Sequence, residues 1–195
     1  MLTGCFLMLM YSAFFSIGSL VGGALVQLEV PTHWAWGGGS LSSMGLLDFA
    51  GGTVVHITAG VAALLFALVL GPRRGFPKTS MMPHNMTMTV TGTGMLWVCW
   101  FGFNAGSVMA ADGNAGMALL VTYISVAAVA LTWMAMEWTR YGKPATIPVP
   151  VPSTGMVAGL GTITPASGYV GPAGALVIGL LTGFLCFNAA NFIKR

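Results

Sequence analysis

Charged side chains are scarce in this chain of 195 residues, in which Asp, Glu, Lys and Arg together make up only 6%. An ordinary soluble domain carries about 25% of charged residues. The chain therefore has too few charges to cover a water-exposed globular surface, which excludes a soluble enzyme and a disordered tail. Its seven basic and four acidic residues give a formal net charge of +3, which is too little for a nucleic-acid-binding face.

Cysteine is also scarce, and the three cysteines, Cys5, Cys99 and Cys186, all lie in apolar runs. This pattern fits neither a disulfide framework nor a CxxC metal site. The sequence also contains no cluster of Cys, His and Asp at metal-ligand spacing, no nucleophile–base pair and no phosphate-binding glycine motif. We therefore expect no metal, no cofactor and no enzymatic activity.

What the chain has in excess is apolar residues, which make up 56% of it, and its mean hydropathy is +0.85. A helix that spans a bilayer needs about 20 mostly apolar residues. We therefore predict an all-α polytopic membrane helix bundle that occupies residues 1–195 as one transmembrane domain. About six segments are expected, roughly at residues 5–27, 49–70, 86–110, 115–138, 153–165 and 171–192.

The segment at 153–165 is too short to cross alone, so it is either a short or tilted helix inside the bundle or a re-entrant segment. If it is counted, the six spans alternate across the bilayer. All seven basic residues then fall on one side, in the 71–83 and 139–152 loops and at the C-terminus. The positive-inside rule makes that side cytoplasmic, and we expect a multi-pass protein of the plasma membrane.

Glycine is abundant, with 28 residues. Small residues inside membrane helices let neighbouring helices approach closely. We expect this role for the glycines within spans, among them Gly92, Gly94, Gly102 and Gly106.

His56 is the most prominent polar residue inside a predicted span. It follows Asp48 by eight residues, which places it about 12 Å deeper if the segment is α-helical. An imidazole can donate from one ring nitrogen, accept at the other and titrate near neutrality. Two interpretations stay open: a proton relay or ligand for a small polar solute, and a structural histidine bonded to a nearby carbonyl.

Two residues lie near the opposite, acidic side of the predicted bundle. Asp48 precedes Gly51 and Gly52 at a helix start, where a carboxylate can cap backbone N–H groups or draw cations toward a mouth. Trp36 precedes a run of three glycines, which gives the backbone unusual freedom. The glycines can place Trp36 over a pore mouth, or the indole can simply anchor the chain at the membrane interface.

The segment at 86–110 carries Trp100, Phe103 and Ser107 at spacings that share one helical face. Aromatic faces can bind cations as water is stripped away, and a ring can close a narrow path. An ordinary aromatic interface belt is the alternative for Phe103 and Ser107 and the preferred interpretation for Trp97.

Five motifs in this sequence resemble those of the ammonium transporter family (Amt/Mep), in the same order. They are His33–Gly39, Asp48–His56, Pro83–Asn85, Trp100–Ser107 and Thr164–Tyr169. The resemblance covers roughly residues 28–195 and implies transport of ammonium or ammonia.

The resemblance also implies roles for individual residues. In the family, ammonium is recruited at an external vestibule, and aromatic rings form a gate below it. A histidine relays protons along the pore. An acidic residue is structural or assists deprotonation. The corresponding positions are Trp36, Ser107 and Thr164 for the vestibule, Phe103 and Trp100 for the gate, His56 for the relay and Asp48 for the acidic residue.

The family fold implied by the resemblance is an eleven-helix homotrimer with a pore in each protomer, and prokaryotic members are regulated by cytoplasmic PII proteins. This chain matches roughly the fourth to ninth helices. The second pore histidine and the partner of Phe103 are expected outside it. Two alternatives to transport are an ammonium-sensing membrane module and a non-conducting, incomplete fragment.

Overall fold

The computed structural model of the chain describes residues 32–36, 38–76, 78–79, 84–142 and 151–193, so the span expected at 5–27 lies outside the described residues. All regular elements in the described part are helical, which confirms the all-α prediction there. After a helical turn at residues 32–35, the elements are α3 (Ser40–Ser43), the π-helix η1 (Gly52–Ile57), α4 (Thr58–Leu70), α5 (Met86–Gly106), α6 (Gly113–Tyr141), α7 (Val151–Ile163) and α8 (Pro172–Ile193).

The longest helix, α6, begins and ends at residues suited to those positions. Asp112 Oδ1 accepts hydrogen bonds from the backbone N–H groups of Asn114 at 2.9 Å and Ala115 at 3.1 Å, which satisfies donors that have no partner in a first turn. Gly142 ends the helix with φ 85°, a conformation that favours glycine. With 29 residues, α6 is about 43 Å long, which exceeds the thickness of a bilayer's hydrocarbon core.

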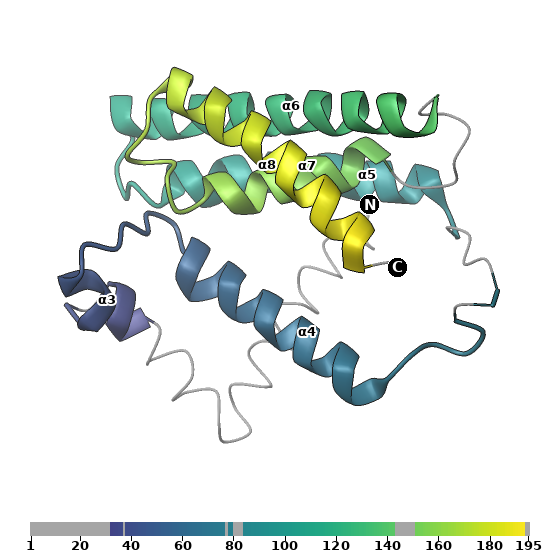
Figure 1. Cartoon of the computed structure of the whole chain (residues 1–195). Helices are drawn as coiled ribbons and strands as arrows, with labels where there is room; N and C mark the ends of the chain where they lie inside the picture. The colour runs from purple at the N-terminus through teal and green to yellow at the C-terminus, as the bar shows by residue number, and fades with distance from the viewer. Residues whose placement is uncertain (1–31, 37, 77, 80–83, 143–150, 194–195) are drawn as a thin grey trace.

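Helix α6 packs against α5, α7 and α8, and Figure 1 shows α8 crossing in front of α6 and α7. Val121, Ile163 and Ala175, one residue from each of α6, α7 and the first turns of α8, form a fully buried cluster. Further along, the rings of Trp133 and Phe187 meet edge to face with centroids 5.5 Å apart. These two clusters hold α6 and α8 together along most of their length.

Glycines allow the closest approaches in this group of helices. A β-carbon at Gly179 would lie 2.6 Å from the Ser125 carbonyl oxygen, and one at Gly183 would lie 2.6 Å from Thr132 Cβ. In contrast, a β-carbon at Gly92, Gly94, Gly102 or Gly106 of α5 would meet nothing within 4 Å in the described part of the chain. The expected role in close packing is therefore met by the glycines of α8, while those of α5 face open space there.

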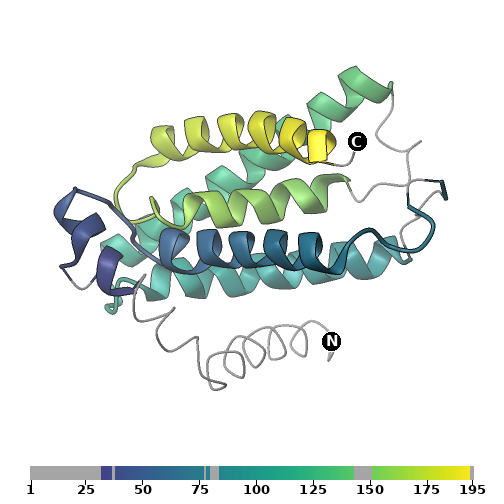
Figure 2. The same cartoon turned by 60° about the horizontal axis from the view of Figure 1, so that its bottom comes forward.

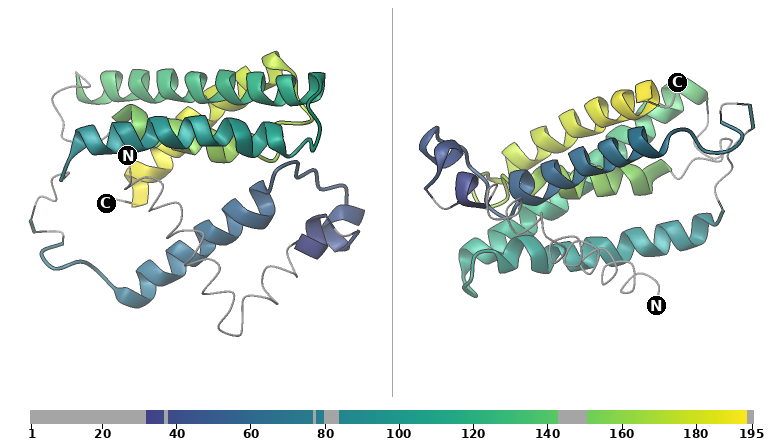
Figure 3. Two further views of the ribbon diagram at one scale, coloured as in Figure 1. Left: turned by 180° about the vertical axis from the view of Figure 1, so that it is seen from behind. Right: turned by 90° about the horizontal axis from the view of Figure 1, so that it is seen from below.

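Helix α4 leaves the α5–α8 group, as the views in Figure 3 show. Every residue from Gly60 to Leu70 is exposed, although the helix is apolar on all sides. A helix that is hydrophobic all round is stable only inside a protein or a bilayer. Helix α4 is therefore expected to lie against hydrocarbon or other protein and not against water.

Among the described residues, three helical segments are long and apolar enough to cross a membrane: Gly52–Leu70, Gly113–Tyr141 and Pro172–Ile193. Helix α5 has 21 residues, and four of its first eight residues are threonine. Helix α7 has 13 residues, about 20 Å of helix, and packs against α5, α6 and α8. The expected segment at 153–165 is thus a short helix within the group, and the crossing of all six segments remains a prediction.

Basic side chains gather at one end of the described structure. Figure 2 shows that the C-terminal ends of α4, α6 and α8 and the N-terminal end of α5 lie at this end. Arg73, Arg74 and Lys78 follow α4, and Arg140 lies in the last turn of α6. Asp48 and Asp112 lie at the opposite end, as the expected separation of basic and acidic residues requires, and which end faces the cytoplasm remains a prediction.

Replacing Gly179 with alanine should destabilise the α6–α8 contact. The new methyl group would press on the Ser125 backbone, which cannot move without shifting α6, and such overpacking costs about 1–3 kcal/mol. Thermal unfolding of the detergent-solubilised protein measures the effect. The matched control is Gly94→Ala, where a β-carbon would meet no neighbouring described segment within 4 Å. Equal stability of Gly179→Ala and the wild type would show that α6 and α8 pack differently.

Candidate functional site

The site begins at the turn before η1, where Asp48 is only 4% exposed. Its Oδ1 accepts hydrogen bonds from the backbone N–H groups of Gly51 and Gly52 at 2.9 and 2.7 Å. Its Oδ2 accepts from those of Thr53 and Val54 at 2.8 and 3.1 Å. The carboxylate therefore satisfies four backbone donors at the positive end of the helix. Asp48 thus caps the helix with both carboxylate oxygens, each of which accepts two backbone hydrogen bonds.

The backbone around this cap requires glycine and forms a wide turn. Gly51 has φ 102°, which residues with a β-carbon disfavour. Residues 52–57 then form the π-helix η1, and His56 lies within it. The depth of His56 calculated from an α-helical rise after Asp48 therefore does not apply. Short π-helical segments occur frequently at functional sites.

Trp36 reaches the same turn from the preceding segment. Its indole Nε1 donates a hydrogen bond to the Asp48 carbonyl oxygen at 2.5 Å, and a β-carbon on Gly51 would lie 3.5 Å from the indole ring. The indole is nevertheless 47% exposed. Trp36 is thus fixed at the Asp48 turn while about half of its surface stays exposed.

The segment after α7 packs against the Asp48 turn from another side. The Phe49 N–H donates to the Pro165 carbonyl at 3.0 Å, and the Phe49 ring meets that of Tyr169 edge to face at 5.8 Å. Gly52 has no room for a β-carbon, which would collide with the ring of Pro165. These contacts place residues 164–169 beside η1.

Three rings from η1 and α5 form a cluster next to residues 164–169. The His56 centroid lies 5.2 Å from that of Trp100 and 6.0 Å from that of Phe103, with the His56 and Phe103 planes nearly parallel. The Trp100 and Phe103 centroids are 5.3 Å apart. Phe103 is 40% exposed, so one side of the cluster is open. The predicted relay histidine and the two predicted gate rings therefore contact one another.

The polar partner of this cluster is Thr164, which is fully buried. Its Oγ1 accepts a hydrogen bond from Trp100 Nε1 at 2.8 Å and lies 3.3 Å from His56 Nε2. It also donates to the Leu160 carbonyl at 2.8 Å. Thr164 was expected at the vestibule, and its contacts place its hydroxyl against the histidine and the tryptophan instead. Its vestibule role remains a prediction.

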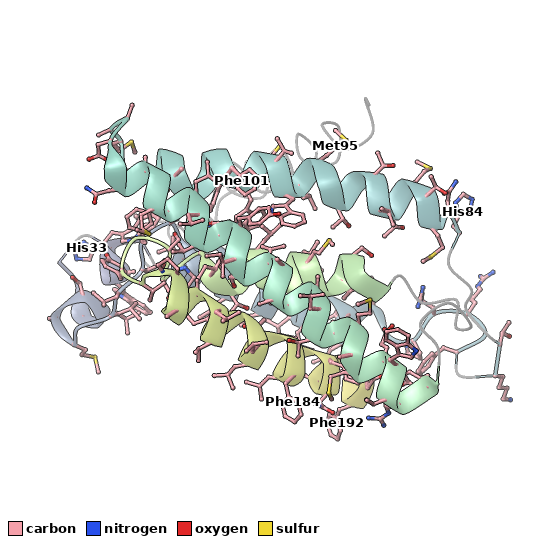
Figure 4. All side chains as sticks on the ribbon, turned by 90° about the horizontal axis from the view of Figure 1, so that it is seen from above. His33, His84, Met95, Phe101, Phe184 and Phe192 are labelled. Atoms are coloured by element: carbon pink, nitrogen blue, oxygen red, sulfur yellow. The ribbon has the colours of Figure 1, made fainter. Side chains whose placement is uncertain are left out.

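Ser107 lies one helical turn beyond Phe103 at the end of α5. Its hydroxyl donates to the Phe103 carbonyl at 2.8 Å, which leaves the oxygen lone pairs available as acceptors. Trp97 and Phe101 occupy a different face of α5 and pack against Tyr123 of α6, with centroids 5.5 and 6.4 Å away. Figure 4 labels Phe101 between these two helices. The rings of α5 thus divide into a packing face and a face toward His56.

Two features of the site were not found from the sequence. One is the contact between His56 and Thr164, which are 108 residues apart. The other is a buried pair in which Asn104 Nδ2 donates to Thr122 Oγ1 at 2.9 Å, fixing the end of α5 on α6. An asparagine inside an apolar helix was the available signal for this second pair, because an unpaired amide there is costly.

The family model for the Ammonium Transporter Family matches residues 8–195 of the chain. The chain belongs to the ammonium transporter family. This is a family of integral, multi-pass membrane transporters and not of enzymes.

Named relatives agree with the family match. The chain is 47% identical over 164 residues to the ammonium transporter Amt1 of Archaeoglobus fulgidus, an alignment that covers 84% of this chain and 41% of the relative. It is 41% identical over 194 residues to the ammonium transporter of Bacillus subtilis, covering 100% of this chain and 46% of the relative. The chain therefore spans less than half the length of these curated relatives.

Solved structures share the fold. The crystal structure of Candida albicans Mep2 aligns with TM-score 0.78 and 35% identity over 88% of this chain and 38% of that one. A structure titled Sensor Amt Protein aligns with TM-score 0.79 and 33% identity, covering 88% of this chain and 45% of that one. The helices described above therefore form part of a known membrane fold.

Replacing Asp48 with asparagine should destabilise the fold, because an amide offers one accepting oxygen where the carboxylate offers two. Its NH2 group would also face two backbone N–H donors. Hydrogen bonds to charged groups are worth about 1.5–3 kcal/mol each, so we expect a loss of about 3 kcal/mol or more in thermal unfolding.

The matched control is Asp112→Asn. There both backbone donors bind the same oxygen, Oδ1, which the amide retains. The other oxygen accepts from the exposed Asn114 side-chain amide, which can turn toward water, and asparagine caps helices about as well as aspartate. Equal losses in the two variants would contradict the four-donor role of Asp48.

Proposed function

We propose that this chain contributes part of a transmembrane pathway for ammonium and its neutral form, ammonia. One observation carries the proposal: in a member of the ammonium transporter family, His56, Trp100, Phe103 and Thr164 come together from three separate segments. An imidazole beside partly exposed rings offers a hydrogen-bonding group within an otherwise apolar surface. This combination suits a small solute that crosses the membrane after losing its charge.

Recruitment of ammonium is assigned to Trp36 and Ser107. Trp36 is 47% exposed, and the face of an exposed indole attracts cations. The Ser107 oxygen retains lone pairs that can accept from the N–H groups of ammonium. The vestibule role proposed for Thr164 is secondary, because its buried hydroxyl already has three neighbours.

Loss of the proton follows from the cost of burial. Moving an unpaired ammonium ion into an apolar site is far more costly than moving a neutral amine. The neutral amine then passes Phe103 and forms a hydrogen bond with His56, and the proton travels separately through the histidine. Whether His56 carries that proton is tested by the flux experiment below.

Asp48 is assigned a structural role in this pathway. A carboxylate has about four lone-pair sites, and four backbone N–H groups occupy them in the Asp48 turn. No site is left to take a proton from ammonium. The cap instead fixes η1, and with it the position of His56.

The arrangement of the whole protein is proposed from the family resemblance and from charge. The basic end faces the cytoplasm and Trp36 faces outward, in a plasma-membrane homotrimer whose six spans in this chain belong to a larger fold. A cytoplasmic PII protein is the proposed regulator and nitrogen uptake the proposed physiological role. Exposed apolar side chains, such as Phe184 and Phe192, which point away from the other helices in Figure 4, support contact with lipid or other protein.

Ammonium sensing is the second candidate function. It is supported by the likeness to the structure titled Sensor Amt Protein, which aligns as well as Mep2 does. Recruitment at Trp36 and Ser107 serves both functions. They differ in whether ammonium crosses the membrane.

Replacing His56 with alanine in the full-length protein should reduce ammonium flux into liposomes by at least about tenfold. The variant loses the hydrogen bond to the neutral amine, worth about 0.5–1.5 kcal/mol, and with it the proposed carrier of the proton. A stopped-flow measurement of internal pH after an ammonium gradient reports the flux.

The control is His84→Ala, because His84 is exposed and lies at the end of the molecule far from His33 in Figure 4. Unchanged flux and selectivity in His56→Ala would contradict the role of His56. Binding of ammonium by the wild type without any flux would favour sensing or a non-conducting protein.

A further inference from the structure

The hydroxyl group of Thr164 has three polar neighbours and only one hydrogen to share among them. The neighbours are Trp100 Nε1 at 2.8 Å, the Leu160 carbonyl oxygen at 2.8 Å and His56 Nε2 at 3.3 Å. A hydroxyl group supplies one donor and two acceptor lone pairs. The chemistry of the neighbours therefore decides how these three capacities are used.

Two of the three assignments follow directly. The indole N–H of Trp100 can only donate, so it fills one lone pair of Thr164. The Leu160 carbonyl can only accept, and its 2.8 Å distance is the usual length of an O–H···O hydrogen bond. The single hydrogen of Thr164 therefore lies on Leu160.

His56 must then use the lone pair that remains. A ring nitrogen without hydrogen would place its lone pair against that of Thr164, so Nε2 has to carry a hydrogen and donate it. We propose that Thr164 is a positioning residue that holds neutral His56 as its Nε2–H tautomer and leaves Nδ1 as the acceptor.

The opposite tautomer is disfavoured by the same contacts. With hydrogen on Nδ1, His56 Nε2 would need the Thr164 hydrogen. The Leu160 oxygen and Thr164 Oγ1 would then face each other at 2.8 Å as two acceptors. Since Thr164 is fully buried, water cannot relieve that repulsion, and a buried acceptor pair costs the full loss of its hydrogen bond.

The tautomer matters for the pathway, and this consequence rests on the proposed function. A solute that bears N–H groups can donate only to a ring nitrogen without hydrogen, which here is Nδ1. A proton carried by His56 likewise arrives at Nδ1, and Nε2 already holds one. Thr164 thus selects which ring nitrogen of His56 is left to accept a hydrogen bond.

Solid-state NMR of the full-length protein in lipid bilayers, with ¹⁵N-labelled histidine, tests the proposal. The pH is set well above the ordinary histidine pKa so that the ring is neutral. Correlation of each ring nitrogen with its neighbouring carbon separates Nδ1 from Nε2, and the His56 signal is the one missing from His56→Ala. We expect the Nε2–H form to exceed the other at least about fivefold, as one hydrogen bond would give.

Two variants separate the hydroxyl from the shape of the side chain. Thr164→Ser keeps the hydroxyl and should keep the wild-type tautomer, whereas Thr164→Val keeps the shape and should lower the excess of Nε2–H by about fivefold. An Nδ1–H signal for His56 in the wild type would overturn the proposal, even if the valine variant fails to fold. Equal tautomer ratios in the valine variant and the wild type would also overturn it.

These spectra do not depend on transport. Absence of ammonium flux together with an Nε2–H signal would refute the proposed function and leave the tautomer assignment standing. Flux together with an Nδ1–H signal would do the reverse.

Discussion

A buried carboxylate is tolerated only when its charge is compensated, and the site of this protein is built around that requirement. Asp48 meets it with backbone N–H groups from four consecutive residues, 51–54. Because those groups belong to one turn, binding them fixes the path of the chain into η1. The Asp48 carbonyl holds Trp36 at the same time, and the adjacent Phe49 holds Pro165. The Asp48 side chain fixes the turn, and the backbone of Asp48 and Phe49 then holds two further segments against it.

The parts of this arrangement that depend on near neighbours in the chain could be predicted from the sequence. The shared face of Trp100 and Phe103 follows from helical spacing, and the position of Asp48 before Gly51 indicates a cap. The membrane class follows from composition. In each case the physical cause lies within a few residues or in the chain as a whole.

The remainder depends on contacts between segments that lie far apart in the sequence. No local pattern joins His56 to Thr164, and the π-helical turn arises from the cap on one side and Pro165 on the other. The glycines show the same limit. Sequence predicts that small residues permit close approach, but only the packed helices show that Gly179 and Gly183 are used in this way while the glycines of α5 are not.

The π-helix also ties function to the exact number of residues in the chain. A wide turn of this kind accommodates one residue more than an α-helical turn between the same fixed ends. Loss of a single residue between Gly52 and Ile57 would let the turn close into an α-helix between those ends and remove the wider turn in which His56 lies. Along this short stretch the number of residues therefore decides the path of the backbone around His56, as glycine does at position 51.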